Sequence, residues 1–390
     1  MNFSENGHRG NSVFIRGAYG TNNLGDDLIL YAVLRYCARA GASVTLEVRE
    51  YDERIREIER ELGGYKVSTV TLGSSFQRYR AALSSDRIII GGGGIFPNNH
   101  PRYVLATFVL AVMAFLTRKK FDIIGISVNP IRSRVSKLMW KAILAVSGAV
   151  FVRSKTSLDN LHQACGAIAK KKVTLSADLV FSLRSSKVME PPAPADSEHY
   201  DIALIPAEPW TPEEMEHEHF QERYKQLVSD FRSLIDQLEQ AGKKVCLVPF
   251  YLPGDMNILN DIDEAYGGRH IFQDENMFAR IRALSKCNRI LTMRFHGVVL
   301  SSLLRKKVVA IAYDYKHTEL MELLGKKKDL FYFGIRHQDF FDAEFDLTPY
   351  TQQIYEAIVD SSSEGIATAD AVVTGLEVAA THALESVFPV

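Results

Sequence analysis

Two spacings of hydrophobic residues alternate along the first half of the chain. Short runs rich in β-branched residues predict strands, and longer stretches of apolar residues three or four apart predict helices. The predicted strands are 12–16, 43–48, 66–70, 87–90, 123–128 and 149–152. The predicted helices are 28–38, 52–62, 101–117 and 134–146. Strands that alternate with helices favour a parallel sheet built from right-handed crossovers.

A proline-rich polar stretch, residues 188–199, interrupts this alternation and is typical of a linker. The alternation then resumes with strands at 201–206, 244–249, 289–293 and 308–313 and helices at 212–240, 275–286 and 298–304. We therefore predict an α/β fold of two doubly wound Rossmann-like domains facing a cleft. Their predicted bounds are 1–187 and 200–348, and an alanine-rich helical tail, 349–390, packs back on the first domain.

Length and composition agree with a soluble two-domain protein. A chain of 390 residues fits two domains of about 150 residues each. The four cysteines lie singly, without the spacing of a disulfide framework or zinc site. The apolar run 103–117 is shorter than the ~20 residues that a membrane-spanning helix needs. The N-terminus lacks the plan of a signal peptide, so a cytoplasmic location is expected.

Charge is distributed unevenly between the two halves. Residues 1–185 hold 26 Lys and Arg against 14 Asp and Glu, a net of +12, whereas residues 186–390 hold 20 against 33, a net of −13. A basic half attracts anionic lipid, a diphosphate-bearing acceptor or nucleic acid, although a solvated basic surface explains it equally well. Nucleic acid is disfavoured because no RNP motif, helix-turn-helix signature or zinc finger is found. Peripheral contact with the inner face of an anionic membrane is a further hypothesis.

Unusual residues follow four of the predicted strands, at Gly20–Asp26, Gly91–Gly94, Arg153 and Arg294–His296. Carboxyl ends of parallel strands line the ligand crevice of open α/β sheets, so one cleft is expected to gather them. Because Asp26 precedes a helical stretch, it either caps that helix or acts as a base or hydroxyl ligand.

The glycine run is either a sharp strand exit or a place where backbone N–H groups meet an anion or sugar. Its pattern matches neither GxGxxG nor the P-loop, so NAD and ATP are not indicated.

Two arginines suit a ligand with two negative charges, because a guanidinium grips a carboxylate or phosphate through two parallel hydrogen bonds. For Arg153 and Arg294 the alternative is a structural ion pair. Beside Arg294, His296 is either a histidine that only bonds the backbone or a proton donor, since imidazole titrates near neutral pH. Lys316, which is expected to close the next strand, adds a third positive charge.

These motifs, taken in order, resemble those of the polysaccharide pyruvyltransferases. The resemblance covers roughly residues 12–325 and is carried by GAYGTNNLGDDLIL, IIIGGGGIF, SVNP, FVRSKTSLDNL, ADLVF, RFHGVVLSSL and VVAIAYDYK. It implies a GT-B-like fold and transfer of the pyruvyl group of phosphoenolpyruvate onto a sugar, with a ketal as product. Asn129 departs from the pattern, where the family more often has glycine, so neither Asn129 nor Ser127 is given a role.

The resemblance also implies roles for individual residues. It makes His296 the general acid and places Asp26 in the acceptor region as a second catalytic residue. The expected substrate-binding residues are Arg153, Arg294, Phe295, Lys316, Gly92, Gly93, Gly94 and Asn23. No metal and no cofactor are expected, with phosphoenolpyruvate as co-substrate and a sugar or lipid-linked oligosaccharide of a surface polysaccharide precursor as acceptor.

Two other functions remain open. One is a GT-B glycosyltransferase that uses a nucleotide sugar, with Glu319 or Glu322 as the ribose ligand. The other is a non-catalytic protein that binds a saccharide or polyanion through its basic first half. The oligomeric state is left undetermined by the sequence.

Overall fold

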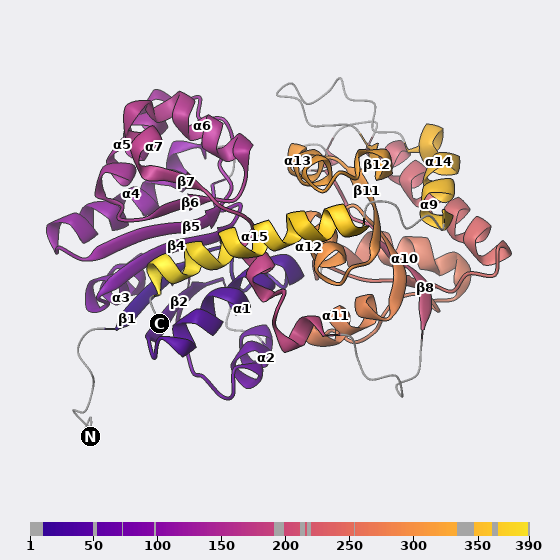
Figure 1. The fold of residues 1–390 in the computed structure, drawn as a ribbon, viewed down its shortest axis with the longest axis horizontal. Coiled ribbons are helices and arrows are strands. Elements are labelled where there is room, and N and C mark those ends of the chain that lie inside the picture. The colour runs from indigo at the N-terminus through magenta and orange to yellow at the C-terminus, as the bar shows by residue number, and fades with distance from the viewer. Residues whose placement is uncertain are drawn as a thin grey trace. The chain divides into compact units, whose positions relative to one another are not determined.

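The structure is a computed structural model that describes residues 11–49, 53–71, 73–96, 99–190, 199–210, 215–216, 220–252, 254–333, 347–360 and 366–388. Most of the predicted linker, 188–199, lies outside these ranges. The described residues divide into two compact units (Figure 1). The first unit lies within Met1–Asn22, Asp26–Ser182 and Leu376–Val390, and the second within Asn23–Gly25 and Leu183–Gly375.

The first unit is built on a parallel sheet of seven strands in the order β3-β2-β1-β4-β5-β6-β7. The strands are β1 (Ser12–Arg16), β2 (Ser43–Val48), β3 (Ser68–Thr71), β4 (Arg87–Gly93), β5 (Lys120–Ile126), β6 (Val150–Val152) and β7 (Val173–Leu175). The chain starts in the middle, builds outward to β3, and then crosses to the other side of β1. The strand order therefore reverses between the neighbours β1 and β4.

Helices connect these strands. They are α1 (Leu24–Arg39), α2 (Glu53–Glu61), α3 (Ser75–Ser84), α4 (Pro101–Leu116), α5 (Arg134–Val146), α6 (Lys155–Cys165) and α7 (Ala167–Lys172). Phe14, Ile88 and Ile123 of the sheet form one core with buried side chains of α3 to α7. The alternating residues Ile89 and Ile124 are also fully buried. Both faces of the sheet are thus covered, as parallel crossovers require.

The second unit has a parallel sheet of five strands in the order β12-β11-β10-β8-β9. Its strands are β8 (Tyr200–Ile205), β9 (Val245–Leu247), β10 (Cys287–Thr292), β11 (Lys307–Ala312) and β12 (Leu330–Tyr332). Its helices are α9 (Phe220–Gln240), α10 (Met256–Asp263), α11 (Met277–Ser285), α12 (Phe295–Leu303), α13 (Tyr315–Leu323) and α14 (Thr351–Val359). The strand order reverses between β8 and β10.

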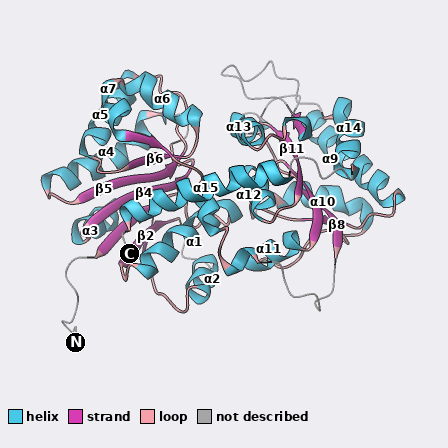
Figure 2. Ribbon diagram, in the orientation of Figure 1, coloured by secondary structure: helices cyan, strands magenta, loops and turns pink. Residues whose placement is uncertain are grey.

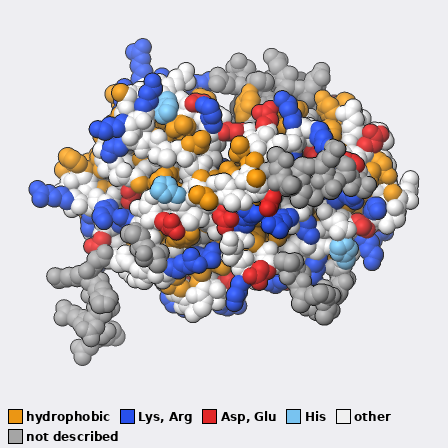
Figure 3. Space-filling view, in the orientation of Figure 1, with side chains coloured by type: hydrophobic (Ala, Val, Ile, Leu, Met, Phe, Trp, Pro, Cys, Tyr) orange, Lys and Arg blue, Asp and Glu red, His pale blue; other side chains and the backbone are white. Residues whose placement is uncertain are grey.

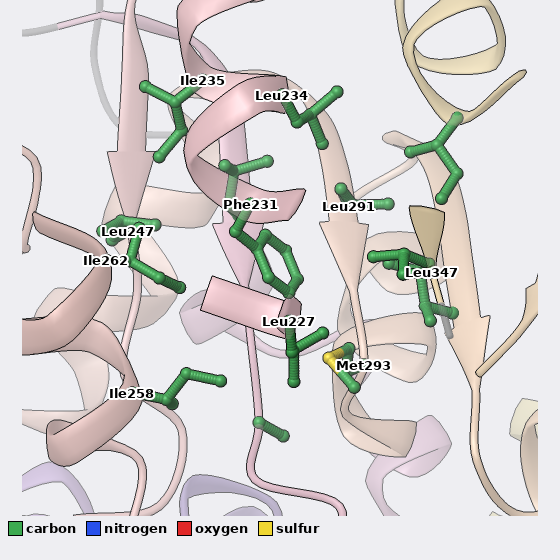
Figure 4. Close-up of a cluster of buried hydrophobic side chains, with 14 of the residues drawn as sticks. Leu227, Phe231, Leu234, Ile235, Leu247, Ile258, Ile262, Leu291, Met293 and Leu347 are labelled. Atoms are coloured by element: carbon green, nitrogen blue, oxygen red, sulfur yellow. The ribbon is translucent and has the colours of Figure 1, made fainter. Parts of the chain in front are cut away.

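Figure 4 shows the core on one face of this second sheet, where Phe231 of α9 clusters with Leu291 of β10 and with Met293, which directly follows that strand. Helices α10 and α14 complete that core with buried leucine and isoleucine side chains. On the other face, α11, α12 and α13 pack on β10 and β11. Helices and strands alternate in both units, as Figure 2 shows by colour.

The last helix, α15 (Ile366–Val387), is shared by the two units. Its first part contacts the second unit through Asp370, which pairs with Arg184 at 2.7 Å. Its later part belongs to the first unit, where the carbonyl of Ala379 accepts a hydrogen bond from Ser176. Residues 351–359, which we assigned to the tail, form α14 and pack in the second core.

Two parallel, doubly wound sheets confirm the predicted α/β fold class. Several details differ from the sequence predictions. Helices α1 and α12 begin at Leu24 and Phe295, earlier than predicted. The short edge strands β7 and β12 and the helices α3, α10 and α13 were not predicted. In the described part of the chain, no helix is long and apolar enough to cross a membrane.

Candidate active site

Each sheet has one point where the strand order reverses, and most of the predicted site residues lie beside these points, whereas Arg153 and Lys316 follow the strands β6 and β11. Ligands of open α/β sheets bind outside the carboxyl ends of the strands there. In the first unit, the ends of β1 and β4 lead into the glycine-rich loop at residue 17 and the glycine run at residue 91. In the second unit, the ends of β8 and β10 lead to Glu208 and Arg294.

The glycine run at the end of β4 is packed closely by the start of α1. Gly92 and Gly93 have φ angles of 75° and 76°, in the left-handed region that favours glycine. A Cβ at Gly93 would lie 2.6 Å from Oδ1 of Asp26, and one at Gly92 would lie 2.5 Å from Ile29. Gly94 is exposed and has open space where a Cβ would stand. The run therefore lets the Asp26 carboxylate approach the backbone and leaves Gly94 accessible.

Tyr19 supports the same corner of the first unit. Its hydroxyl donates a hydrogen bond of 3.0 Å to the carbonyl of Gly91. Burial, followed by the charge of Asp26, raises the pKa of Tyr19 above its usual value. The hydroxyl is thus neutral and remains a donor at physiological pH.

The sequence predicted that Asp26 precedes its helix. This prediction was wrong, because α1 already begins at Leu24. Both Asp26 and Asp27 lie in the first turn, where a carboxylate complements the helix dipole. The cap is Asn23, whose Oδ1 accepts a hydrogen bond of 3.0 Å from the N–H of Gly25. Asn23 forms an antiparallel bridge with Tyr251 within the second unit. The structure thus gives Asn23 a capping role beside its predicted role in binding.

Arg153 follows β6 in the first unit and is held by two polar side chains. Its Nη1 donates to Oδ2 of Asp178 at 2.7 Å, and its Nε donates to Oγ of Ser127 at 2.5 Å. The side chains of Arg153 and Asp178 are 6% and 2% exposed. This is the structural ion pair that we considered as the alternative. A ligand at Arg153 would compete with Asp178, and the role of Arg153 in substrate binding stays a prediction.

Arg294 follows β10 in the second unit and pairs with a buried carboxylate. Its Nη2 donates to Oδ1 of Asp255, which is 0% exposed. The other oxygen of Asp255 accepts from the backbone N–H groups of Phe250 and Tyr251, at 3.1 and 2.8 Å. Three donors therefore fix this carboxylate, and the carboxylate in turn fixes the guanidinium.

Arg294 keeps its positive charge although its guanidinium is largely buried. Burial opposes the charged form, but the attraction of Asp255 and the hydrogen bond to Tyr313 outweigh it and hold the pKa of Arg294 above its usual value. The Nε of Arg294 is buried and has no hydrogen-bond partner among the residues that the structure describes. A cation with one donor still to be satisfied is suited to an anionic ligand.

His296 and Phe295 form the first turn of α12, not a corner that precedes the helix. Their rings stand edge to face with centroids 5.2 Å apart. The segment Asn23–Gly25 of the same unit packs against this histidine, since a Cβ at Gly25 would lie 1.8 Å from Nδ1 of His296. The imidazole is half-buried and needs a glycine opposite it.

Behind Phe295 lies a second histidine, His317, which the sequence did not single out. It is fully buried, with ring centroids 6.2 Å from Phe295 and 5.2 Å from Tyr313. Burial, and then the charge of Lys316, lower the pKa of His317 to about 4. It is therefore a neutral residue whose ring packs against the aromatic side chains of Phe295 and Tyr313.

Lys316 was predicted to close a strand. It lies instead in the first turn of α13. Its Nζ is 3.4 Å from Oδ2 of Asp314, the residue that caps this helix. Burial would raise the pKa of Asp314, but Lys316 and His317 outweigh it and lower that pKa to about 2. The charge of Lys316 is thus partly balanced within its own turn.

Glu208 is a candidate that sequence reasoning missed. It follows β8, the neighbour of β10, and is half-buried. Burial, and then the nearby charge of Asp255, raise the pKa of Glu208, although hydrogen bonding to Asn257 and the charge of Arg294 oppose this. The signal available in the sequence was an acidic residue two positions after a predicted strand, 201–206.

Among the described residues, no group of three or more His, Cys, Asp or Glu is arranged to hold a metal ion. The glutamates considered as ribose ligands lie in α13. One of them, Glu322, pairs with Lys327 at 3.1 Å.

A sequence model of the family described as polysaccharide pyruvyl transferase matches residues 23–315. The chain belongs to the polysaccharide pyruvyl transferase family. It is therefore a transferase of the class that pyruvylates polysaccharides. The match includes every predicted site residue except Lys316, which lies one position beyond it. A search of curated protein sequences finds no match.

Solved structures that resemble this family member share its fold. MnaA of S. aureus, solved with UDP, has a TM-score of 0.61 at 11% identity, over 97% of this chain and 95% of that chain. The UDP-GlcNAc 2-epimerase of Methanocaldococcus jannaschii, in complex with UDP-GlcNAc and UDP, has a TM-score of 0.58 at 11% identity, over 94% and 99%. At such identities the likeness shows the fold alone, and that fold is the predicted GT-B-like one.

The buried histidine gives a pH-dependent prediction. The pKa of His317 is about 4 in the folded state and ~6.5 in the unfolded state, so only the unfolded chain binds a proton between these values. The stability that this neutral group retains above pH ~6.5 is lost as pH falls toward 4, by an amount on the order of 3 kcal/mol.

Denaturant unfolding at several pH values measures this loss. The variant His317→Gln is expected to flatten the loss between pH ~6.5 and 4, whereas the exposed His199→Gln is expected to keep the wild-type profile. An equal slope in wild type and His317→Gln would contradict the assignment.

Proposed function

We propose that this pyruvyl transferase moves the pyruvyl group of phosphoenolpyruvate onto a sugar of a surface polysaccharide precursor, forming a pyruvate ketal and releasing phosphate. The observation that carries the proposal is the Arg294–His296 corner at the strand-order reversal of the second sheet. There a fixed guanidinium with an unsatisfied buried donor stands two residues from an imidazole. Membership of the family supplies the reaction class.

The donor substrate fits this corner chemically. Phosphoenolpyruvate carries a carboxylate and a phosphate, and a guanidinium binds either group through parallel hydrogen bonds. Asp255 already occupies one edge of Arg294, so the ligand is expected to meet the remaining edge, which includes Nε. We propose that Lys316 and Phe295 complete the donor side, with Lys316 as the additional positive charge.

In the proposed reaction, His296 in its protonated form donates a proton to the methylene carbon of phosphoenolpyruvate. The electron pair of the carbon–carbon double bond takes up that proton, and the enol carbon becomes electrophilic. A sugar hydroxyl then bonds to this carbon and loses its own proton. The carbon–oxygen bond to phosphate then breaks and phosphate leaves with the bonding electron pair. A second hydroxyl bonds to the same carbon and loses its proton, which closes the ketal. No cofactor besides the phosphoenolpyruvate co-substrate is needed.

The first unit is proposed to supply the acceptor side. Asp26, whose carboxylate lies against the backbone of Gly93, is the base that we propose for an acceptor hydroxyl. The left-handed glycines and the accessible Gly94 leave room for a sugar beside it. We propose that Asn23 orients the start of α1, and thereby Asp26, through its cap on Gly25.

A phosphate-release assay tests the proposal. With phosphoenolpyruvate and the right sugar precursor, we expect phosphate to appear only when both are present, and mass spectrometry to find a pyruvyl group on the sugar. His296→Ala is expected to lower kcat by ~10²–10⁴-fold while phosphoenolpyruvate still binds, because only proton donation is lost. Exposed His199→Ala is the control. Full activity of His296→Ala would remove this histidine from the mechanism.

A conservative change at the arginine tests the donor site. Arg294→Lys keeps the charge but loses the planar two-point grip, so we expect KM for phosphoenolpyruvate to rise by about tenfold or more, with a smaller change in kcat. The matched control is Arg289→Lys, on the same strand and away from its carboxyl end. An unchanged KM for Arg294→Lys would rule out the assigned role.

The second candidate is a glycosyltransferase that uses a nucleotide sugar, which the GT-B-like fold accommodates. It predicts release of a nucleotide and addition of a sugar, without consumption of phosphoenolpyruvate. A non-catalytic saccharide-binding protein predicts binding to the polymer without release of phosphate. The same assay separates the three outcomes by their products.

A further inference from the structure

The outer surface of α3, α4 and α5 in the first unit combines features that the proposed reaction does not use. The stretch 101–146, which contains α4 and α5, holds eight Lys and Arg and a single acidic residue, Asp122. Asp122 is buried, and its Oδ1 accepts from the N–H of Ala149. This surface is therefore predominantly basic, although the exposed Asp86, which follows α3, lies close to Lys119 at its edge.

Large hydrophobic side chains are exposed on the same three helices. Nine of the thirteen exposed ones among the described residues are found there. They are Phe76, Leu83, Tyr103, Leu105, Val112, Phe115, Leu116, Val135 and Leu138. α4 packs against both α3 and α5, so the three helices form one continuous layer on the sheet. In Figure 3, orange and blue side chains lie side by side over the margin formed by α4 and α5.

The exposed apolar residues of α4 follow a helical spacing, so they form one continuous face and are not isolated surface residues. Leu105, Val112 and Leu116 are seven and four residues apart, which places them on one stripe of a helix. The exposed fraction is greatest at the end of the helix, 68% at Phe115 and 73% at Leu116. Other residues of the helix, including Val104, Ala111 and Ala114, are buried in the core.

Basic side chains flank the apolar C-terminal end of α4. Arg118 follows it with a φ of 56°, a left-handed position that usually holds glycine. The turn is closed by a hydrogen bond of 2.9 Å from the N–H of Lys119 to the carbonyl of Ala114. Arg118 and Lys120 are exposed beside Phe115 and Leu116. Apolar side chains beside exposed basic ones match the chemistry of an anionic bilayer surface.

We propose that this face docks on an anionic lipid bilayer, with Phe115 and Leu116 entering the headgroup region and Arg118 and Lys120 binding lipid phosphates. Aliphatic side chains outnumber aromatic ones on the face, and they stack poorly on bases, so a nucleic acid fits less well. This inference goes beyond the proposed reaction, because it concerns where the enzyme binds in the cell and not a chemical step.

Co-sedimentation of the full chain with vesicles tests this inference. We expect binding to vesicles of equal parts phosphatidylcholine and phosphatidylglycerol at low salt, none to phosphatidylcholine alone, and release as salt rises. The double variants Phe115→Glu/Leu116→Glu and Arg118→Glu/Lys120→Glu are each expected to weaken partitioning by about tenfold or more. Since these side chains are exposed, the thermal melts should match wild type.

The matched control is Leu323→Glu/Lys327→Glu, an exposed apolar and basic pair on the second unit, which should bind as wild type. Failure of the wild type to bind anionic vesicles would overturn the inference. So would unchanged binding by both α4 variants, or binding to single-stranded RNA in preference to the vesicles. Because no phosphoenolpyruvate is present, these outcomes are independent of the proposed reaction.

Discussion

Parallel strands impose the constraint on which this molecule depends. Each strand must be followed by a crossover helix, so both faces of both sheets are covered and largely apolar. Buried carboxylates within the strands, such as Glu47 and Asp122, are paired with arginine side chains. Accessible polar chemistry is therefore concentrated at the ends of the strands. At the carboxyl ends the chain leaves each strand as a loop that opens a helix, and the reversal of strand order spreads two such loops apart. Asp26, Glu208, Arg294 and His296 all belong to loops or first helical turns of this kind.

Within the second unit, Asp255 determines how the corner can act. A buried carboxylate that lost its guanidinium would be left with an uncompensated charge, which typically costs 3–5 kcal/mol. The pair therefore holds Arg294 in one orientation before any ligand arrives. Such pre-organisation reduces the ordering that binding would otherwise require. The aromatic rings of Phe295, His317 and Tyr313 form the apolar support beside it.

Much of the fold was readable from the sequence, because long apolar strands end in glycine or charged residues. The strands β7 and β12 were not predicted because each is three residues long, which is too short to show a period of two. The early start of α12 was missed because Gly297 reads as a helix breaker. Instead it allows close packing: a Cβ there would lie 2.1 Å from Oγ1 of Thr292. Helix and strand meet at this glycine.

The site was predictable in its residues but not in their partners. Arg153, Arg294 and His296 were legible as charged residues after strands. Their partners lie far along the chain: Asp178 is 25 residues from Arg153, and Asp255 is 39 residues from Arg294. No local pattern encodes such pairs, since they arise only when the sheet is assembled. Glu208 had a local signal, its place just after a predicted strand, but its significance lies in its neighbours Asp255 and Arg294.

The central claim is that the second unit binds phosphoenolpyruvate at Arg294, and thermal unfolding with added ligand tests it most directly. A ligand that binds only the folded state raises Tm in proportion to the logarithm of its concentration above Kd. The account predicts that phosphoenolpyruvate raises Tm of the wild type, that Arg294→Lys needs a higher concentration for the same shift, and that UDP-GlcNAc raises neither. A shift with UDP-GlcNAc and none with phosphoenolpyruvate would contradict it.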